Sequence, residues 1–271
     1  MPELPEVETS RRGIDPHIRG QTIARSVVRQ PQLRWPVSPQ ITALMPGQTV
    51  LGTQRRGKYI LIETTAGHII IHLGMSGSVR ILPAGAPAAK HDHIDIVFTH
   101  ELMLRYTDPR RFGCVLWSED AIAEHPLLAR LGPEPLAEDF DTSYLFRLSR
   151  GRKTPIKSFI MDSHVVVGVG NIYANEALFM AGIRPLVEAG SVSRVRMARL
   201  VACIKQVIAH AITVGGTTLR DFVGGDGKPG YFQQSLLVYG RGTEPCKQCG
   251  GILQEVRLSA RSTVFCKRCQ R

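Results

Sequence analysis

Apolar and polar residues alternate in short runs through the first half of the chain. Between about residue 22 and residue 117, runs rich in Val, Ile and Leu are separated by turn residues. The turns at 65–67 and 99–101 favour antiparallel pairing, and 83–90 has the composition of a surface loop. We therefore predict an antiparallel β-sandwich or barrel. Its predicted strands are Thr22–Arg29, Thr49–Arg55, Tyr59–Glu63, His68–Leu73, Ser78–Leu82, His93–Thr99 and Leu102–Tyr106.

The period of the apolar positions changes after a break at 131–135. Beyond it the spacing fits a helix, most clearly in Ser193–Thr213, where Ser193 is the expected N-cap. Shorter helices are predicted at 143–149 and 171–181, and another at the N-terminus from Pro5 to about Gly13. The fold class is therefore α+β. The expected domains are 1–132 (sandwich), 133–236 (helical) and 237–271 (a small module).

The charge of the chain points to a polyanionic partner. Lys and Arg number 34 against 23 Asp and Glu, the formal net charge is +11, and the pI is about 9.7. Nucleic acid is the leading candidate. The first 20 residues are too charged for a secretory signal, and the sequence has no run of 18 apolar residues. We expect no membrane association and a cytoplasmic location.

The C-terminal module contains two Cys-x-x-Cys pairs. Cys246 and Cys249 form the first pair, and Cys266 and Cys269 form the second. This spacing is typical of a closed tetrahedral zinc site built on a β-hairpin. Four thiolates leave no open position for water, so we predict one structural zinc ion per chain and no organic cofactor. Several Lys and Arg in the module suggest phosphate contacts.

The N-terminus carries candidate catalytic groups. If Met1 is removed, Pro2 becomes a secondary amine with a pKa near ~8, and hence partly nucleophilic at neutral pH. Its condensation with a sugar aldehyde gives a cationic iminium, which acts as an electron sink. Glu3 is a candidate general acid beside it. The alternative, an acidic helix start on the surface with no chemistry, stays open on these residues alone.

Further candidates lie on glycine-containing loops. Met75, Arg110 and Phe112 have the shapes of wedges that fill the gap left by an extruded base; alternatively they are a core Met, a surface Arg and a core Phe. Lys58 is a phosphate contact or a solvated strand end. The glycine turn before Asn171 presents N–H groups to a phosphate, makes a tight turn, or does both.

Several motifs together resemble the bacterial formamidopyrimidine-DNA glycosylases. They are Pro2 followed by ELPEVE, the TDPRRFG loop, GVGNIYANEALF and the four-cysteine finger, in order from residue 2 to residue 269. The resemblance implies a β-sandwich joined to a helical domain with a helix-two-turn-helix motif and a zinc finger. It implies a monomer that binds damaged double-stranded DNA. The implied activity is removal of oxidised purines (8-oxoguanine and formamidopyrimidines), followed by strand cleavage through β- and δ-elimination.

The resemblance also implies residue roles. Among the catalytic residues, Pro2 is the nucleophile, Glu3 the proton donor, Lys58 assists at the lesion, and Arg261 grips a phosphate for δ-elimination. The implied DNA contacts are His91, Arg110, Arg152 and Asn171. The implied gap-filling residues are Met75, Arg110 and Phe112. The implied lesion pocket contains Glu6, Thr217 and Tyr231, the last two in the loop that closes on an oxidised purine.

Two other functions compete with this hypothesis. A glycosylase resembling endonuclease eight shares the fold but prefers oxidised pyrimidines; Leu4 argues against it, since that group begins PEGPE. A zinc-finger DNA-binding protein without catalysis is the rival of another class. The presence of both Pro2 and Glu3 argues against it.

Overall fold

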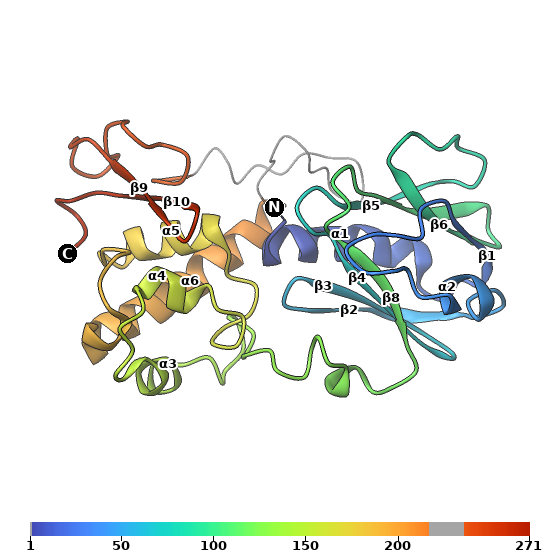
Figure 1. Cartoon of the computed structure of the whole chain (residues 1–271), viewed down its shortest axis with the longest axis horizontal. Coiled ribbons are helices and arrows are strands. Elements are labelled where there is room, and N and C mark those ends of the chain that lie inside the picture. The colour runs from blue at the N-terminus through green and yellow to red at the C-terminus, as the bar shows by residue number, and fades with distance from the viewer. Residues whose placement is uncertain (1, 217–235) are drawn as a thin grey trace. The chain divides into compact units, whose positions relative to one another are not determined.

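The chain divides into two compact units. The structure, a computed structural model, describes residues 2–216 and 236–271. Among these, the first unit comprises residues 2–129 and 214–216, and the second comprises 130–213 and 236–271. Figure 1 labels the elements of both. The expected domain boundaries at 132 and 236 stay a prediction.

The first unit is an antiparallel β-sandwich, as predicted. Its two four-stranded sheets have the orders β1-β6-β7-β5 and β2-β3-β4-β8. All seven predicted strands are present to within a residue or two at each end, and β8 is a strand that the prediction left out. The strands are β1 (Ile23–Val28), β2 (Val50–Arg56), β3 (Tyr59–Thr64), β4 (Gly67–His72), β5 (Ser78–Pro83), β6 (Asp92–Phe98), β7 (Leu102–Thr107) and β8 (Cys114–Ser118).

Both predicted hairpin turns connect neighbouring strands. Thr64 pairs with Gly67 across the β3–β4 turn. Glu101, in the turn between β6 and β7, has a positive φ of 64°. Such tight connections explain why sequence-adjacent strands pair, and they bring the ends of β4, β5 and β7 to loops that carry candidate site residues.

Helix α1 (Leu4–Ile18) packs against strands of both sheets (Figure 1). It runs five residues beyond the predicted end at Gly13 (18 − 13) and includes Pro16. Ile14 and Ile18 are fully buried in the sandwich core. A proline inside a helix costs about 3 kcal/mol, while burying each isoleucine contributes about 1.5–3 kcal/mol. Tertiary burial therefore extends the helix past the expected stop.

The second unit is mainly helical. It contains α3 (Thr142–Ser149), α4 (Ile156–Ile160), α5 (Asn171–Met180) and α6 (Arg194–Thr213). Ser193 accepts the N–H of Arg196 at 3.4 Å, as its predicted capping role requires. Helix α4 was not predicted because one turn is too short for a readable period. Short elements elsewhere are α2 (Gln40–Ala43), η1 (Ile122–Glu124) and η2 (Ala189–Ser191).

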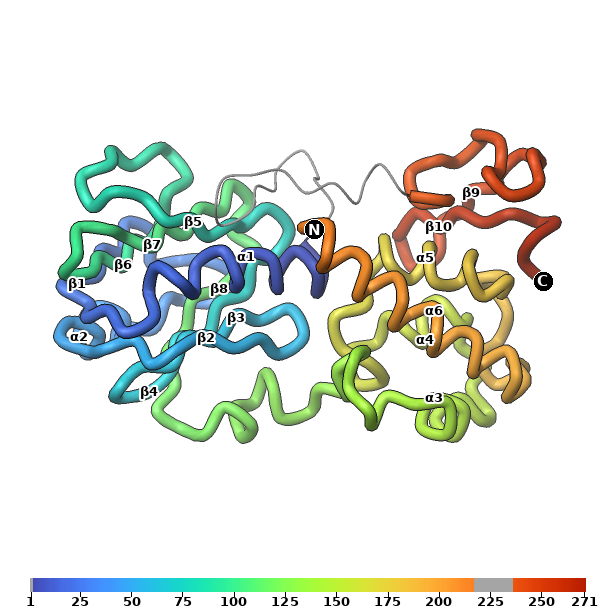
Figure 2. The backbone as a smooth tube through the Cα atoms, turned by 180° about the vertical axis from the view of Figure 1, so that it is seen from behind, coloured from blue at the N-terminus to red at the C-terminus, as the bar shows by residue number. Residues whose placement is uncertain are grey.

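The C-terminal hairpin, β9 (Gln254–Leu258) and β10 (Arg261–Phe265), packs on the helices of the second unit. Figure 2 shows α5 beside α6. Phe179 of α5 joins Val238, Leu253 and Val264 in one apolar cluster with Cys246 and Cys266. The predicted α+β class is confirmed. Among the described residues, none of the helices combines the length and apolar character needed to cross a membrane.

Candidate active site and nucleic-acid contacts

Pro2 and Glu3 lie at the N-terminus of α1. Glu3 is the N-cap residue: its carboxylate accepts the backbone N–H of the third helical residue, and its own N–H donates to Glu6 Oε2 at 2.8 Å. Glu3 and Glu6 are 1% and 0% exposed. This reciprocal capping box fixes both carboxylates and places them at the positive end of the helix dipole. Glu3 follows Pro2 directly in the chain, so the capping box fixes its carboxylate close to the Pro2 nitrogen.

Glu8 anchors this end of the helix to the sheet. Its carboxylate accepts hydrogen bonds from Arg11 at 2.8 Å, Arg12 at 2.7 Å and Arg55 of β2 at 3.1 Å. Burial alone would raise the pKa of Glu8, but the hydrogen bonds from Arg11 and Arg12 and the charges of Arg11 and Arg55 lower that pKa to about 2. Glu8 is thus ionised at neutral pH. It holds α1 against the end of β2, close to the turn that carries Lys58.

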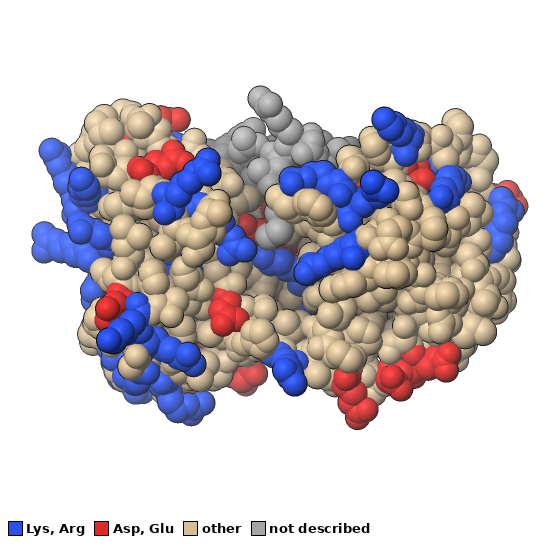
Figure 3. Space-filling view, in the orientation of Figure 1, with Lys and Arg blue, Asp and Glu red and all other residues tan. Residues whose placement is uncertain are grey.

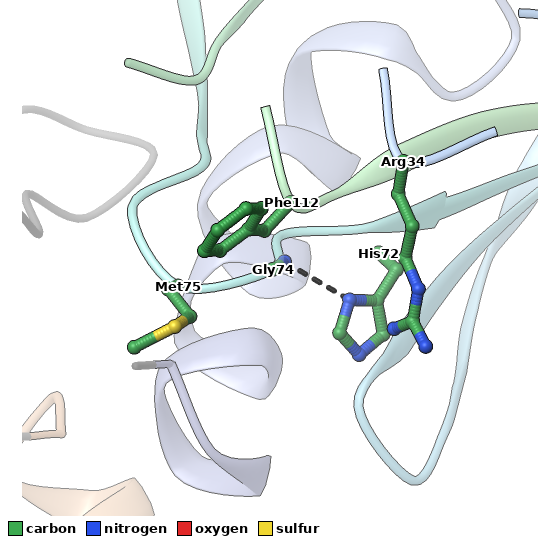
Figure 4. Close-up of a pocket in the computed structure, with 5 residues that line it drawn as sticks. All are labelled: Arg34, His72, Gly74, Met75 and Phe112. Atoms are coloured by element: carbon green, nitrogen blue, oxygen red, sulfur yellow. Dashed lines mark hydrogen bonds between the residues drawn. The ribbon is translucent and has the colours of Figure 1, made fainter. Parts of the chain in front are cut away.

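A pocket of about 330 Å³ lies at the end of β4. Its lining residues are Arg34, His72, Gly74, Met75 and Phe112 (Figure 4). In Figure 4 the Arg34 guanidinium lies beside the His72 ring, and Met75 and Phe112 lie on the other side of Gly74. The pocket therefore has one basic wall and one apolar wall.

His72 is neutral in this pocket. Its Nδ1 accepts the Gly74 N–H at 2.9 Å (dashed in Figure 4), which leaves Nε2–H as a donor. Burial, reinforced by the positive charges of Lys58 and Arg34, lowers the pKa of His72 to about 4. Tyr59, the residue after Lys58, pairs with His72 across β3 and β4, so Lys58 lies near His72.

Met75 and Phe112 are not core residues. Their side chains are 39% and 47% exposed, among the most exposed large apolar groups of the described residues. The guanidinium of Arg110 stacks over the Phe112 ring at 4.9 Å. The structure therefore groups the predicted gap-filling residues on two adjoining loops, and the core alternative for Met75 and Phe112 is wrong.

A backbone hydrogen bond connects His91 to the loop that carries Arg110. Its carbonyl accepts the N–H of Asp108 at 3.1 Å, and its ring lies 6.3 Å from that of His93. The loop before His91 is held by Arg105. Arg105 is 2% exposed and donates to the carbonyls of Pro87 at 2.7 Å and Ala86 at 2.9 Å. Asp95 balances the Arg105 charge at 2.8 Å.

On the second unit, Asn171 is the first residue of α5, after Gly170 as N-cap. Its carbonyl accepts the Asn175 side chain at 2.6 Å. The amide of Asn171 therefore stands where the helix dipole favours an anion. Arg152 lies in the exposed turn after α3 and is tied by its carbonyl to Gly190 N–H at 2.9 Å.

Arg261 lies at the tip of the β9–β10 hairpin, opposite Leu258. The turn residues Ser259 and Ala260 have φ values of 49° and 61°, the geometry of a tight two-residue hairpin turn. Below the tip, Lys157 of α4 donates to Ser262 O at 2.9 Å and Thr263 Oγ1 at 2.6 Å. The exposed arginine is thus carried on a hairpin that the helices hold in place.

The four finger cysteines converge. Their sulfur atoms all lie within 4.8 Å of one another; Cys246 and Cys269 are 3.9 Å apart, and Cys249 and Cys266 are 3.5 Å apart. Zn–S bonds of about 2.3 Å in a tetrahedron require sulfur separations of this size. The donor set therefore fits one structural zinc ion, as predicted from the spacing.

Basic side chains lie on the visible surface of both units. Figure 3 shows Lys and Arg (blue) spread over this face, while Asp and Glu (red) form a group along the lower right edge and smaller groups elsewhere. This distribution suits a polyanion on each unit taken separately.

Two predicted lesion-pocket residues lie outside the described part of the chain, and three residues near the site were not predicted. Thr217 and Tyr231 lie outside the described residues, but Gly216 lies against Glu6: a Cβ on Gly216 would be 3.0 Å from Glu6 Oε1. The prediction missed Arg34, His72 and Asp108. Their signal was weak, because a lone basic residue or an Asp before Pro is common in loops.

These observations define a two-unit protein with buried carboxylates at its N-terminus, basic side chains on both units and a four-cysteine site that fits zinc. Three family models match the chain: the formamidopyrimidine-DNA glycosylase N-terminal domain over residues 1–115, its H2TH domain over 131–223, and the zinc finger found in FPG and IleRS over 244–271. The formamidopyrimidine-DNA glycosylase of Stutzerimonas stutzeri is 60% identical, with both chains covered completely.

Solved structures of two proteins are also similar to this chain. The MutM (Fpg) protein of Thermus thermophilus is 38% identical, with a TM-score of 0.89 over 99% of this chain and 98% of that one. A mutant Fpg of Lactococcus lactis in complex with Fapy-dG containing DNA is 34% identical, with a TM-score of 0.93 and complete coverage of both chains. The chain belongs to the formamidopyrimidine-DNA glycosylase family.

Proposed function

We propose that this protein removes oxidised purines from double-stranded DNA and then cleaves the strand at the resulting site. The observation that carries the proposal is the N-terminal turn of α1, where a capping box fixes the buried carboxylates of Glu3 and Glu6 beside Pro2. The relatives named formamidopyrimidine-DNA glycosylase, and the Lactococcus protein bound to Fapy-dG containing DNA, support the substrate class. The family match disfavours both the pyrimidine-specific rival and a binding protein without catalysis.

The chemistry follows from the two groups at the N-terminus. After loss of Met1, the Pro2 nitrogen attacks the anomeric carbon C1′ of the damaged nucleotide, and the bond from C1′ to the base breaks. The base leaves with the electron pair and is protonated by water. Glu3 takes the proton of the Pro2 N–H and donates it to the ring oxygen O4′, so that the C1′–O4′ bond breaks and an iminium forms between Pro2 and the sugar. Loss of a C2′ proton expels the 3′ phosphate, and a second elimination expels the 5′ phosphate.

The remaining predicted residues fit this reaction. We assign Lys58 to the lesion and Arg261 to the phosphate that leaves in δ-elimination. We assign the DNA contacts to His91, Arg110, Arg152 and Asn171. Met75, with Arg110 and Phe112, fills the gap in the duplex. Glu6 lines the lesion pocket, to which we also assign Thr217 and Tyr231.

The zinc ion has a structural role in this proposal. Cys246, Cys249, Cys266 and Cys269 would hold it, and with four thiolate ligands it supplies folding energy to the finger and takes no part in the reaction. We further propose that the protein acts as a monomer in the cytoplasm, where the DNA of a bacterium lies.

The test is borohydride trapping on duplex DNA with one 8-oxoguanine opposite cytosine, followed by peptide mapping of the adduct. We expect a covalent adduct on Pro2, none with Pro2→Gly, and loss of base release with Glu3→Gln. Glu134→Gln, a change in the linker after the sandwich, is the control and keeps trapping. If trapping persists undiminished in Pro2→Gly, another amine, or any N-terminal amine, suffices as the nucleophile. If wild-type protein binds DNA but is trapped on neither oxidised purines nor pyrimidines, the enzyme assignment fails.

A further inference from the structure

Ser76 and Asp108 join the two loops that carry the gap-filling residues. Ser76 Oγ donates to Asp108 Oδ1 at 2.7 Å and accepts the backbone N–H of Arg110 at 3.1 Å. Ser76 is 5% exposed and Asp108 is 0% exposed, so both hydrogen bonds are shielded from water. One hydroxyl therefore links the residue after Met75 to the residue two before Phe112.

Asp108 is the centre of this junction. Its second carboxylate oxygen accepts Gly113 N–H at 2.9 Å and the Tyr106 hydroxyl at 3.1 Å. Its backbone carbonyl contacts His93 Nε2 at 2.8 Å, and its N–H donates to the carbonyl of His91. This single buried residue at the start of the 108–113 loop thus contacts the Met75 loop, the other end of its own loop, and the His91 segment.

The backbones of the two loops are also in direct contact. A Cβ on Gly74 would lie 2.4 Å from the carbonyl carbon of Phe112 and from the nitrogen of Gly113. A Cβ on Gly113 would lie 2.3 Å from the carbonyl oxygen of His72. Since no side chain separates them at these points, a shift of one loop displaces the other.

We propose that Ser76 is a positioning residue for base extrusion, a role that rests on the proposed glycosylase function. Its hydroxyl holds Met75, Arg110 and Phe112 as one rigid wedge. Opening a base stack costs a few kcal/mol, and a pre-organised wedge does not lose further entropy on insertion. Without the hydroxyl, the two loops order separately on the DNA. The role differs from catalysis because Ser76 acts through its neighbours.

The test compares two substrates under single-turnover conditions. Ser76→Ala should slow release of 8-oxoguanine opposite cytosine in a duplex about tenfold, the effect of losing one or two buried hydrogen bonds. On a duplex with a preformed abasic site, which has no base to extrude, cleavage should stay within about twofold of wild type. Ser76→Thr, which keeps the hydroxyl, should restore base release. Ser78→Ala, a buried serine of β5, is the matched control and should match wild type on both substrates.

Amide hydrogen exchange of the DNA-free protein supplies a second readout. The Arg110 amide should exchange faster in Ser76→Ala, while amides in the middle of β4 and β7 keep their protection. Unchanged Arg110 exchange overturns the proposal, as does equal loss on both substrates, which would indicate a general structural role, or loss on neither. If wild-type protein processes neither substrate, the proposed function itself has failed, and the exchange experiment still decides whether Ser76 couples the loops.

Discussion

Lys157 Nζ lies 2.6 Å from Thr263 Oγ1, and this contact ties α4 to the hairpin that carries Arg261. Lys157 is 1% exposed, and its second bond goes to the carbonyl of Ser262, next to Arg261. A buried ammonium bonded to one strand of a two-stranded hairpin restricts where the hairpin tip lies. The finger thus depends on the helical unit for its position, and on its own cysteines for its internal structure.

Replacing Lys157 by Met should weaken the action of Arg261. Met preserves most of the side-chain volume but leaves the Thr263 hydroxyl without this donor, which costs about 1–3 kcal/mol. We expect the ratio of δ- to β-elimination product to fall about threefold to tenfold, with zinc content unchanged. Gel analysis of cleaved DNA measures the ratio. Lys205→Met, which removes a bond to Ala137 O in the same unit, is the control. An unchanged ratio, or an equal change in the control, would contradict the positioning role.

Removal of the zinc ion should unfold the finger and leave the sandwich intact. The apolar cluster of the finger is small, and structural zinc contributes about 10–16 kcal/mol to folding of such modules. We expect metal analysis to find one zinc per chain. In Cys249→Ser we expect weakened metal binding and a loss of DNA affinity. Cys203→Ser, in α6, is the control and should keep its zinc. Folded wild-type protein without zinc would contradict the assignment.

Gly74→Ala should destabilise the first unit and impair base extrusion together. Gly74 has a φ of 61°, and its new Cβ would meet the Phe112 and Gly113 backbone. The left-handed conformation costs about 1 kcal/mol, and we expect a total of about 3 kcal/mol because backbone atoms must move. Gly20→Ala isolates the conformational part, since Gly20 has a φ of 76° and open space around its Cβ position. Denaturant unfolding compares the two; equal losses would show that the loops tolerate the methyl group.

Much of this architecture was predictable from local pattern, and its limits have physical causes. Two Cys-x-x-Cys pairs predict a zinc site because the two-residue spacing brings both thiolates of each pair to the same metal ion. The strands followed from alternation. The Ser76–Asp108 pair was not predictable, because it depends on the register of β5 and β7, in which Ser78 pairs with Thr107. That register is set by the packed core. Likewise, burial of Ile14 and Ile18 carried α1 through Pro16 against the local signal.

Stability should fall as pH decreases from about 6.5 to about 4, in part because of His72. Its pKa is about 4 in the folded protein and near 6.5 when unfolded, so the unfolded chain takes up this proton first. The contribution of His72 is fully present above pH 6.5 and is lost as pH falls to 4; for a half-buried group we expect about 2 kcal/mol. Glu8, whose pKa is about 2 in the folded protein, contributes stability that is lost only below about pH 4.5, so its effect falls almost wholly at lower pH than that of His72.

The variant His72→Asn isolates this effect. The Asn side chain carries an acceptor near the position of Nδ1, for the Gly74 N–H, but does not titrate. We therefore expect a flatter stability profile between pH 6.5 and 4 than in wild type, measured by urea unfolding at a series of pH values. Ile70→Val, in the middle of β4, changes no titratable group and is the control, which should keep the wild-type slope. Parallel profiles for wild type and His72→Asn would show that His72 takes up its proton equally in both states, contrary to the neutral imidazole inferred from its burial between Lys58 and Arg34.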